Sequence, residues 1–242
     1  MRSLGQVTVA GLQALPVFPH CGSMDGMDWK STQIYMIDFE GSPASGVVEY
    51  GVVHLAGGHI RGTETGLCRP TGSISSRDRE VHGIGEGEAM AHEPFSAHYA
   101  HFVELRRRGV FAAHNRHAEN GFIKNTWALP PAVPDWRTGS GTAQEWGPWV
   151  DTLSLYKAVY PGLESYGLGD LVEAFGLRQL LDQTAAEYCP QKRQKPHCAL
   201  YDALASSLLL IYLESLEEMS DRMSIRWLLQ LSQGIEPQQE LF

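Results

Sequence analysis

Ile34-Tyr35-Met36-Ile37-Asp38-Phe39-Glu40 is a short apolar run with high strand propensity, and the turn signal Gly41-Ser42-Pro43 follows it. Because side chains alternate between the two faces of a strand, the carboxylates of Asp38 and Glu40 project from the same face. They lie at the carboxyl end of the strand, where α/β sheets tend to bind ligands. A divalent cation would relieve the repulsion between them. A solvated strand end is the other interpretation, because Asp-x-Glu is a common pattern.

The segments around this strand predict further strands and then alternating helices. Residues 46–55 and 59–67 are expected to be strands joined by a turn at Gly57-Gly58, which indicates an antiparallel meander. Residues 110–113 are expected to be a buried strand, whereas residues 68–93 and 130–148 are expected to be loops. Helices are expected over residues 95–108, 118–129, 152–160, 168–175, 177–185 and 199–219, the last with one long apolar face. This order indicates an α/β fold built on a mixed sheet.

The composition is that of one ordinary globular domain. The chain has 242 residues, of which 43% are hydrophobic and 19% are charged. No run of 18 apolar residues exists, so we expect no association with a membrane, and a secretory signal is disfavoured. The formal net charge of -9 argues against the coating of long nucleic acid, but not against a local site for a short end. The four cysteines show no Cys-x-x-Cys spacing, which favours reduced thiols in a cytoplasmic protein.

A histidine and an acid lie around the start of the long late helix. Five residues along an α-helix turn through about 140°, so His197 and Asp202 would not share a face if both lay well inside it. Pro196 fits the approach to a helix or its first turn. We therefore expect His197 on the preceding loop and Asp202 one turn inside, as an inward carboxylate among apolar neighbours. Cys198 beside His197 raises the alternative of a thiol nucleophile, but no orienting acid or amide is evident.

A third group of polar residues follows the strand at residues 110–113. The strand ends in His114-Asn115, and Glu119 comes where the next helix is expected to begin. An acid near a helix N-terminus is favourable on electrostatic grounds alone. Glu119 by itself therefore indicates no functional site, and its meaning depends on the other two groups.

Taken in order, the three motifs resemble the DEDDh branch of the DnaQ-like 3'-5' exonuclease family. The resemblance extends from residue 34 to residue 213 and includes connecting segments at residues 81–84, 150–153 and 160–171. It implies an RNase H-like fold, with a mixed five-stranded sheet flanked by helices, over residues 33–220. Residues 1–32 would then be a flexible N-terminal extension, and residues 221–242 a C-terminal tail.

The resemblance also implies a site for two divalent cations, Mg²⁺ or Mn²⁺. Asp38, Glu40 and Asp202 would hold one ion, and Asp38 would bridge to the second. His197 corresponds to the family's general base, a role that an imidazole can fill near neutral pH. Glu119 stands where the family usually has Asp. Its extra methylene leaves three outcomes open: binding of the second ion, a preference for Mn²⁺, or weakened activity.

A further set of residues becomes a candidate for contacts with the substrate. The set is Phe39, Gly41, His114, Asn115, Lys192, Arg193 and Lys195. Its last three members form a basic cluster before His197, which would meet the phosphates of an entering strand or would be an ordinary solvated loop. Gly41-Ser42-Pro43 replaces the family's usual Thr-Gly, so detailed contacts to the terminal nucleotide are not carried over. Packing of Phe39 within the sheet is an equal alternative.

The last residues of the chain resemble the short clamp-binding peptide of bacterial replication and repair proteins. Gln238 would fix the register of such a peptide, while Leu241 and Phe242 would fill an apolar pocket. We expect an exonuclease that releases nucleoside 5'-monophosphates from single-stranded or frayed DNA 3' ends in proofreading or repair, with a sliding clamp or DNA polymerase as partner. The alternatives are a ribonuclease that trims RNA 3' ends, and a weakly active or inactive adaptor, for which Glu119 is the only sign.

Overall fold

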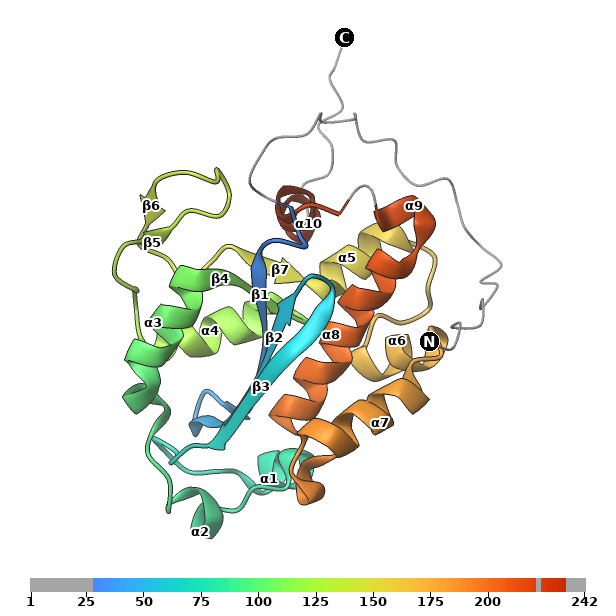
Figure 1. Ribbon diagram of the computed structural model, residues 1–242. Coiled ribbons are helices and arrows are strands. Elements are labelled where there is room, and N and C mark those ends of the chain that lie inside the picture. Colours follow the sequence, from blue (N-terminus) through green and yellow to red (C-terminus); the bar gives the residue numbers. More distant parts are fainter. Residues whose placement is uncertain (1–27, 221–222, 234–242) are drawn as a thin grey trace.

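Figure 1 shows a five-stranded sheet between helices, in a computed structural model that describes residues 28–220 and 223–233. β2 is antiparallel to both β1 and β3, whereas β4 is parallel to β1 and β7 is parallel to β4. The strand order is β3 (His59–Leu67), β2 (Gly46–Ala56), β1 (Gln33–Ser42), β4 (Gly109–Ala113) and β7 (Trp149–Asp151). The predicted α/β fold with a mixed five-stranded sheet is confirmed.

Each face of the sheet has its own set of helices. One face carries α5 (Thr152–Val159), α6 (Leu168–Ala174), α7 (Arg178–Tyr188), α8 (Ala199–Ser215) and α10 (Ile225–Ser232). The opposite face carries η1 (Phe95–His98), α3 (Tyr99–Arg108) and α4 (Arg116–Thr126). The sheet therefore separates two hydrophobic cores, as expected for a layered α/β domain.

The alternation of side chains along β1 assigns each residue to one of these cores. Ile34 and Met36 pack into the core under α8, whereas Tyr35 and Ile37 pack into the core under α3 and α4. Asp38 follows Met36 at an interval of two residues, and Glu40 follows at four. The two carboxylates therefore continue the apolar stripe that faces α8.

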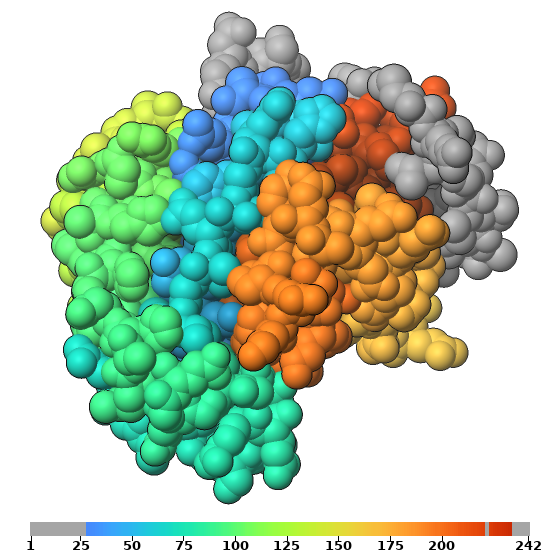
Figure 2. Space-filling view, turned by 60° about the horizontal axis from the view of Figure 1, so that its bottom comes forward, coloured from blue at the N-terminus to red at the C-terminus, as the bar shows by residue number. Residues whose placement is uncertain are grey.

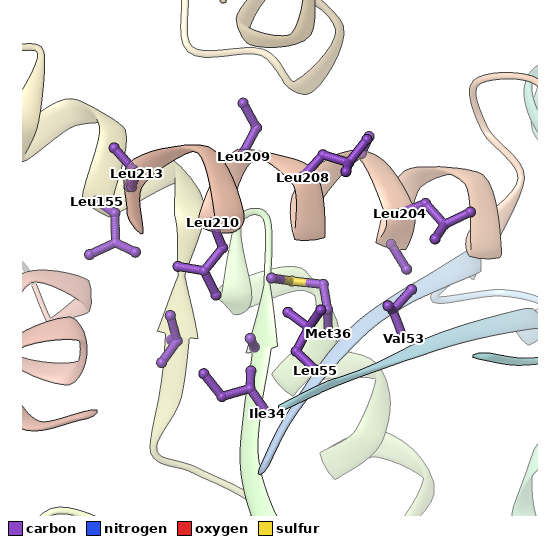
Figure 3. Close-up of a cluster of buried hydrophobic side chains, with 14 of the residues drawn as sticks. Ile34, Met36, Val53, Leu55, Leu155, Leu204, Leu208, Leu209, Leu210 and Leu213 are labelled. Atoms are coloured by element: carbon purple, nitrogen blue, oxygen red, sulfur yellow. The ribbon is translucent and has the colours of Figure 1, made fainter. Parts of the chain in front are cut away.

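Helix α8 forms the centre of the larger core. Twelve of its 17 residues are buried, and in Figure 3 Leu210 points toward the strands while Leu209 points away from them. A helix that is apolar on all sides must be enclosed, and α5, α6, α7 and α9 (Glu217–Ser220) contact α8 where the sheet does not. The sequence predicted one apolar face and an end at residue 219. The helix instead ends at Ser215 and is apolar on more than one side.

Two segments that were expected to be loops contain regular structure. Residues 68–93 include α1 (Ser76–His82) and α2 (Glu86–Ala89), and residues 130–148 include the short strands β5 (Val133–Pro134) and β6 (Thr142–Ala143). The Ser75 hydroxyl accepts a hydrogen bond of 3.0 Å from the Asp78 amide at the start of α1. The loop prediction was wrong because α1 and α2 each bury one residue, which is too few to show a helical period.

The domain also extends beyond its predicted boundaries at residues 33 and 220. Trp29 is buried, and Asp28 forms an isolated β-bridge with Ser224. Helix α10 lies within the segment that was expected to be a tail, and the Ser232 hydroxyl accepts a hydrogen bond of 2.7 Å from the Asp151 amide. The rest of the predicted N-terminal extension and the predicted clamp-binding peptide lie outside the described residues. Within residues 28–220 and 223–233, no helix is long and apolar enough to cross a bilayer.

Candidate active site

Four carboxylates from three elements converge at the carboxyl end of β1. Asp38 and Glu40 belong to β1, Glu119 to the first turn of α4, and Asp202 to the first turn of α8. One ligand atom each from Glu40, Asp202 and His197 lie within 4.8 Å of one another. Glu119 Oε2 accepts a hydrogen bond of 3.0 Å from the Phe39 amide, which lies between the two acids of β1. The fold thus brings together the four acids that the sequence singled out.

This end of the sheet comes forward in Figure 2. There the blue and cyan atoms of β1, β2 and β3 lie recessed between the green atoms of α1 to α4 and the orange atoms around α7. Side chains at the carboxyl end of β1 are therefore reached from solvent between two raised walls. This placement agrees with the general location of ligand sites in α/β sheets.

Gly51 on β2 leaves room for the N-terminus of α8 close to the carboxylates. The sequence analysis did not single out this residue. It lies opposite Asp38 in the sheet, and an added Cβ atom would be 2.3 Å from the Leu200 amide nitrogen. The N-terminus of α8 therefore lies directly against β2, with Asp202 in its first turn. A lone glycine among the valines of β2 was the available signal, because an interior strand glycine often marks a close backbone approach.

Burial and mutual repulsion raise the pKa of all four carboxyl groups. Burial is the largest cause in each case, and it raises the pKa of Glu40 to about 8 and that of Asp202 to about 6. The pKa of Asp38 is raised well above its ordinary value by burial and then by Glu119, Asp202 and Glu40, and the pKa of Glu119 is raised well above its own. Among the described residues no Lys or Arg side chain forms a salt bridge with any of the four, and oxygen-rich acids of this kind suit a hard divalent cation.

His197 lies on the loop before α8, as the sequence predicted, and its side chain lies beside Glu40 and Asp202. Its backbone takes the left-handed conformation, with φ of 59°, and its amide donates a hydrogen bond of 2.9 Å to Asp202 Oδ2. His197 is exposed, whereas the acids around it are partly or fully buried. The imidazole is therefore the solvent-facing group of the site.

Comparisons with known proteins give relatives of one kind, although no protein-family model matches the chain. Over 183 residues the chain is 28% identical to the 3'-5' exonuclease DinG of Bacillus subtilis, a match that covers 74% of this chain and 16% of that protein. Over 131 residues it is 27% identical to the PolC-type DNA polymerase III of Thermotoga maritima, covering 54% of this chain and 9% of that protein. The chain thus spans less than a fifth of either relative's length.

The fold agrees with these relatives. Exonuclease X, solved in complex with 5' overhanging duplex DNA, superimposes with a TM-score of 0.56 at 21% sequence identity, covering 82% of this chain and 99% of that chain. The fold, the sequence relatives and the order of the acidic motifs all agree with an exonuclease-like domain. The chain is similar in sequence and in fold to DnaQ-like 3'-5' exonucleases. The remaining candidate residues can now be compared with what that family led us to expect.

In this DnaQ-like chain the glutamate of the second motif reaches the backbone of β1. Glu119 is 5% exposed, and one of its oxygens is committed to the Phe39 amide. Asn115 directly precedes α4; its backbone is left-handed with φ of 68°, and its amide donates a hydrogen bond of 2.9 Å to Asp151 Oδ1. This fixed start directs the first turn of α4 toward β1, and no hydrogen bond within the described part of the chain uses the second oxygen of Glu119.

Two candidates for substrate contact have structural roles in the DnaQ-like chain. Phe39 is 5% exposed, and its ring packs against Phe95, Phe102 and Phe122 on the face away from the acids. The prediction of a substrate contact for the Phe39 side chain was therefore wrong, because strand alternation turns it into the core. Gly41 has φ of 146°, and an added Cβ atom would be 2.1 Å from the Gly46 carbonyl oxygen, so the β1–β2 hairpin itself requires glycine there.

His114 and Asn115 line an open pocket between the start of α4 and residues 164–168. Nδ1 of His114 is 2.9 Å from Thr152 Oγ1, and Nε2 is 3.0 Å from the Tyr166 carbonyl oxygen. Both nitrogens of His114 are thus engaged within the chain, while Asn115 is exposed at the pocket together with Lys157. A substrate contact from Asn115 stays a prediction. The two hydrogen bonds of His114 fix its ring in the wall of the pocket.

The basic cluster before His197 divides into two kinds of side chain. Lys192 and Lys195 are exposed, in agreement with a role in phosphate contact or with an ordinary solvated loop. Arg193 turns inward instead: Nε donates a hydrogen bond of 2.9 Å to Glu49 Oε1, and Nη1 donates one of 2.6 Å to the His82 carbonyl oxygen. Three of the five N–H donors of Arg193 are thus used within the chain, and a phosphate contact from Arg193 stays a prediction. Glu49 was missed altogether.

Proposed function

We propose that this chain is a divalent-metal-dependent 3'-5' exonuclease that acts on single-stranded or frayed DNA ends and releases nucleoside 5'-monophosphates. One observation carries the proposal: the buried cluster of Asp38, Glu40, Glu119 and Asp202, whose pKa values burial and repulsion raise, with the exposed imidazole of His197 beside it. The exonuclease relatives support the same activity. The chain covers little of those relatives, so the activity of this protein rests on the geometry of its own site.

The four carboxylates fit two Mg²⁺ or Mn²⁺ ions. Asp38, Glu40 and Asp202 would hold one ion, and Asp38 with Glu119 would hold the other, since all four acids have raised pKa values and no cation pairs with them among the described residues. When bound, such ions supply positive charge to the scissile phosphate and to the leaving 3' oxygen. Burial of the acids strengthens that interaction, because the surroundings have a low dielectric constant.

His197 would accept the proton of the attacking water. Its side chain faces solvent at the edge of the acidic cluster, so water reaches it while the acids beneath stay enclosed. The hydrogen bond from its amide to Asp202 fixes the backbone from which the imidazole projects. A histidine can both take up a proton near neutral pH and release it afterward to solvent.

The nucleic-acid substrate is a DNA 3' end in this proposal, with RNA as the rival. Exposed Asn115, Lys157, Lys192 and Lys195 offer donors to phosphate oxygens. The DNA complex of the similar exonuclease X supports DNA for this fold. A role in proofreading or repair is part of the proposal, and so is a cytoplasmic location.

The test is a gel assay on single-stranded DNA and RNA of matched sequence, labelled at the 5' end. We expect DNA to shorten from its 3' end in Mg²⁺ or Mn²⁺ and to stay intact in EDTA or with Asp38→Asn. Asp182→Asn, an exposed acid on α7, is the matched control and should keep full activity. Faster shortening of RNA would reassign the protein to RNA trimming. No shortening with either metal would contradict the catalytic proposal and favour the adaptor.

A sliding clamp or a DNA polymerase is the proposed partner. The PolC-type relative supports a polymerase context, and the clamp-binding peptide at Gln238, Leu241 and Phe242 rests on sequence alone. The full chain should bind a bacterial sliding clamp in a calorimetric titration, and the double substitution Leu241→Ala, Phe242→Ala should abolish that binding. Equal binding by both proteins would exclude this peptide as the contact.

A further inference from the structure

Glu49 is a fifth buried acid beside the site, and the chain's own donors satisfy it. It lies on β2 directly opposite Glu40, and it is 3% exposed. Its Oε1 accepts the hydrogen bond of 2.9 Å from Arg193 Nε, and its Oε2 accepts one of 2.9 Å from the Ala199 amide and a further one from Arg193 Nη2. A bidentate pair between guanidinium and carboxylate is both strong and geometrically specific.

The two groups that Glu49 binds lie on either side of His197 in the sequence. Arg193 precedes His197 by four residues, and Ala199 follows it by two. One carboxylate therefore holds both ends of the short segment that carries the imidazole. Arg193 also donates to the His82 carbonyl oxygen, so the segment is attached to α1 as well as to β2.

We infer that Glu49 and Arg193 are positioning residues, which hold the loop of His197 over the acidic cluster. This inference rests on the proposed function, because it assigns a purpose to the position of His197. The left-handed backbone of His197 needs such support, since a residue with a side chain takes that conformation at a cost in energy. The hydrogen bond from its amide to Asp202 lies inside the same held segment.

Two other roles for this pair fit the contacts less well. A metal ligand needs a free carboxylate oxygen, and both oxygens of Glu49 accept hydrogen bonds from within the chain. A phosphate contact needs N–H donors that point outward, and Nε, Nη1 and Nη2 of Arg193 each already donate to Glu49 or to His82. The pair thus acts on the site through the backbone of the loop.

Steady-state kinetics on Glu49→Gln and Arg193→Gln separate these roles. A misplaced general base lowers kcat with little change in substrate binding. We expect kcat to fall roughly tenfold or more, KM to stay within about twofold, and the double variant to be no worse than either single one. Glu145→Gln, which breaks the exposed pair with Arg137 between β5 and β6, is the matched control and should change neither constant.

Opposite results would assign the pair to one of the other roles. A raised KM with unchanged kcat for Arg193→Gln would make that residue a phosphate contact. Weaker Mn²⁺ binding by Glu49→Gln, measured by calorimetry without substrate, would make Glu49 a metal ligand. Either result would overturn the inference.

Amide hydrogen exchange tests the inference without any activity. In Glu49→Gln, exchange at Ala199 should accelerate about tenfold or more, because its acceptor is weakened, while amides in β1 stay protected. The double variant Glu49→Gln, Arg193→Gln covers the case in which an unpaired buried arginine prevents folding. Unchanged exchange at Ala199 would overturn the inference. Inactive wild-type protein with accelerated Ala199 exchange in the variant would instead contradict only the proposed function.

Discussion

Glu40 and Glu49 lie directly opposite each other on neighbouring strands, and their surroundings differ completely. Both are buried, at 9% and 3% exposure. Glu49 has a bidentate arginine and a backbone amide, whereas Glu40 faces Asp202 and Glu49, and those acids raise its pKa after burial has done so. A buried acid with its own partners is a structural element, while a buried acid without them is a candidate ligand for a cation. Within this cross-strand pair, Glu49 therefore helps to hold the site in place, whereas Glu40 is part of the site.

The largest effect is expected from removing the charge that lacks a partner. Glu40→Gln should lower metal-dependent turnover by about a hundredfold or more, because a bound cation contributes several kcal/mol to the transition state. The metal-free protein should become more stable at pH 8, since one repelling charge is gone. Turnover on single-stranded DNA and urea unfolding in EDTA measure the two changes. Full activity in Glu40→Gln would show that the reaction does not need the Glu40 carboxylate, and would contradict the distinction drawn between Glu40 and Glu49.

The pH dependence of stability should carry the signature of the unpaired acids. Burial raises the pKa of Glu40 from 4.5 to about 8, so the folded state holds more protons than the unfolded state between those values. Stability of the metal-free protein should therefore fall by a few kcal/mol as pH rises from about 4.5 to about 8. Mn²⁺ should restore it at pH 8, because the ion binds the folded state.

Urea unfolding at pH 5 and pH 8, in EDTA and in Mn²⁺, measures this dependence. Glu40→Gln should flatten the pH dependence, and Glu145→Gln, an acid with an arginine partner, should leave it as in the wild type. Equal stability at both pH values in EDTA would show that folding does not raise the pKa of Glu40.

Gly51 sharpens the comparison because it keeps α8 close to both glutamates. Gly51→Ala places a methyl group against the backbone of Ala199 and Leu200, so α8 must shift. We expect a loss of about 1–3 kcal/mol in unfolding free energy, together with lower kcat. Gly62→Ala on β3 is the matched control, since an added Cβ atom there meets nothing within 4 Å. Equal stability of the two variants would contradict the close approach of α8.

The smallest effect is expected at Glu119, which combines features of both glutamates. One oxygen has a backbone partner, as in Glu49, and the other accepts no hydrogen bond from residues 28–220 or 223–233, as in Glu40. Glu119→Asp shortens the side chain by one methylene, so it should lose the bond from Phe39 and shift the ratio of Mg²⁺ to Mn²⁺ activity by about threefold to tenfold. Rates in the two metals measure this ratio. Unchanged rates in both metals would show that Glu119 touches neither ion.

Local patterns predicted the strand of Asp38 and Glu40, the loop position of His197 and the inward side chain of Asp202, because each depends on a few neighbouring residues. The start of α5 was also predicted, since the Asp151 side chain accepts a hydrogen bond from the Leu153 amide, as an N-cap does. Such patterns report the period of an element and the signals at its ends.

Such patterns could not predict that the Arg193 side chain turns inward, or that Glu49 is its partner. Glu49 and Arg193 are 144 residues apart, and a lysine-arginine cluster in sequence has no mark that tells an inward guanidinium from an outward one. Glu49 could have been suspected from its phase in β2, where it falls on the face of Val53 and Leu55. A charged residue on a buried face needs a partner, and only the tertiary fold supplies it.

The hydrogen bond from the Asp151 amide to Ser232 has a consequence for shortened forms of the protein. β7 is the outermost strand of its sheet, and α10 packs against it. A chain cut at residue 220 would lack α10, and this strand edge would then be exposed. Arg116 would also lose its hydrogen bond to the Ser232 carbonyl oxygen. Bare strand edges pair with other chains. Such a protein would tend to aggregate even though every acid of the site is present.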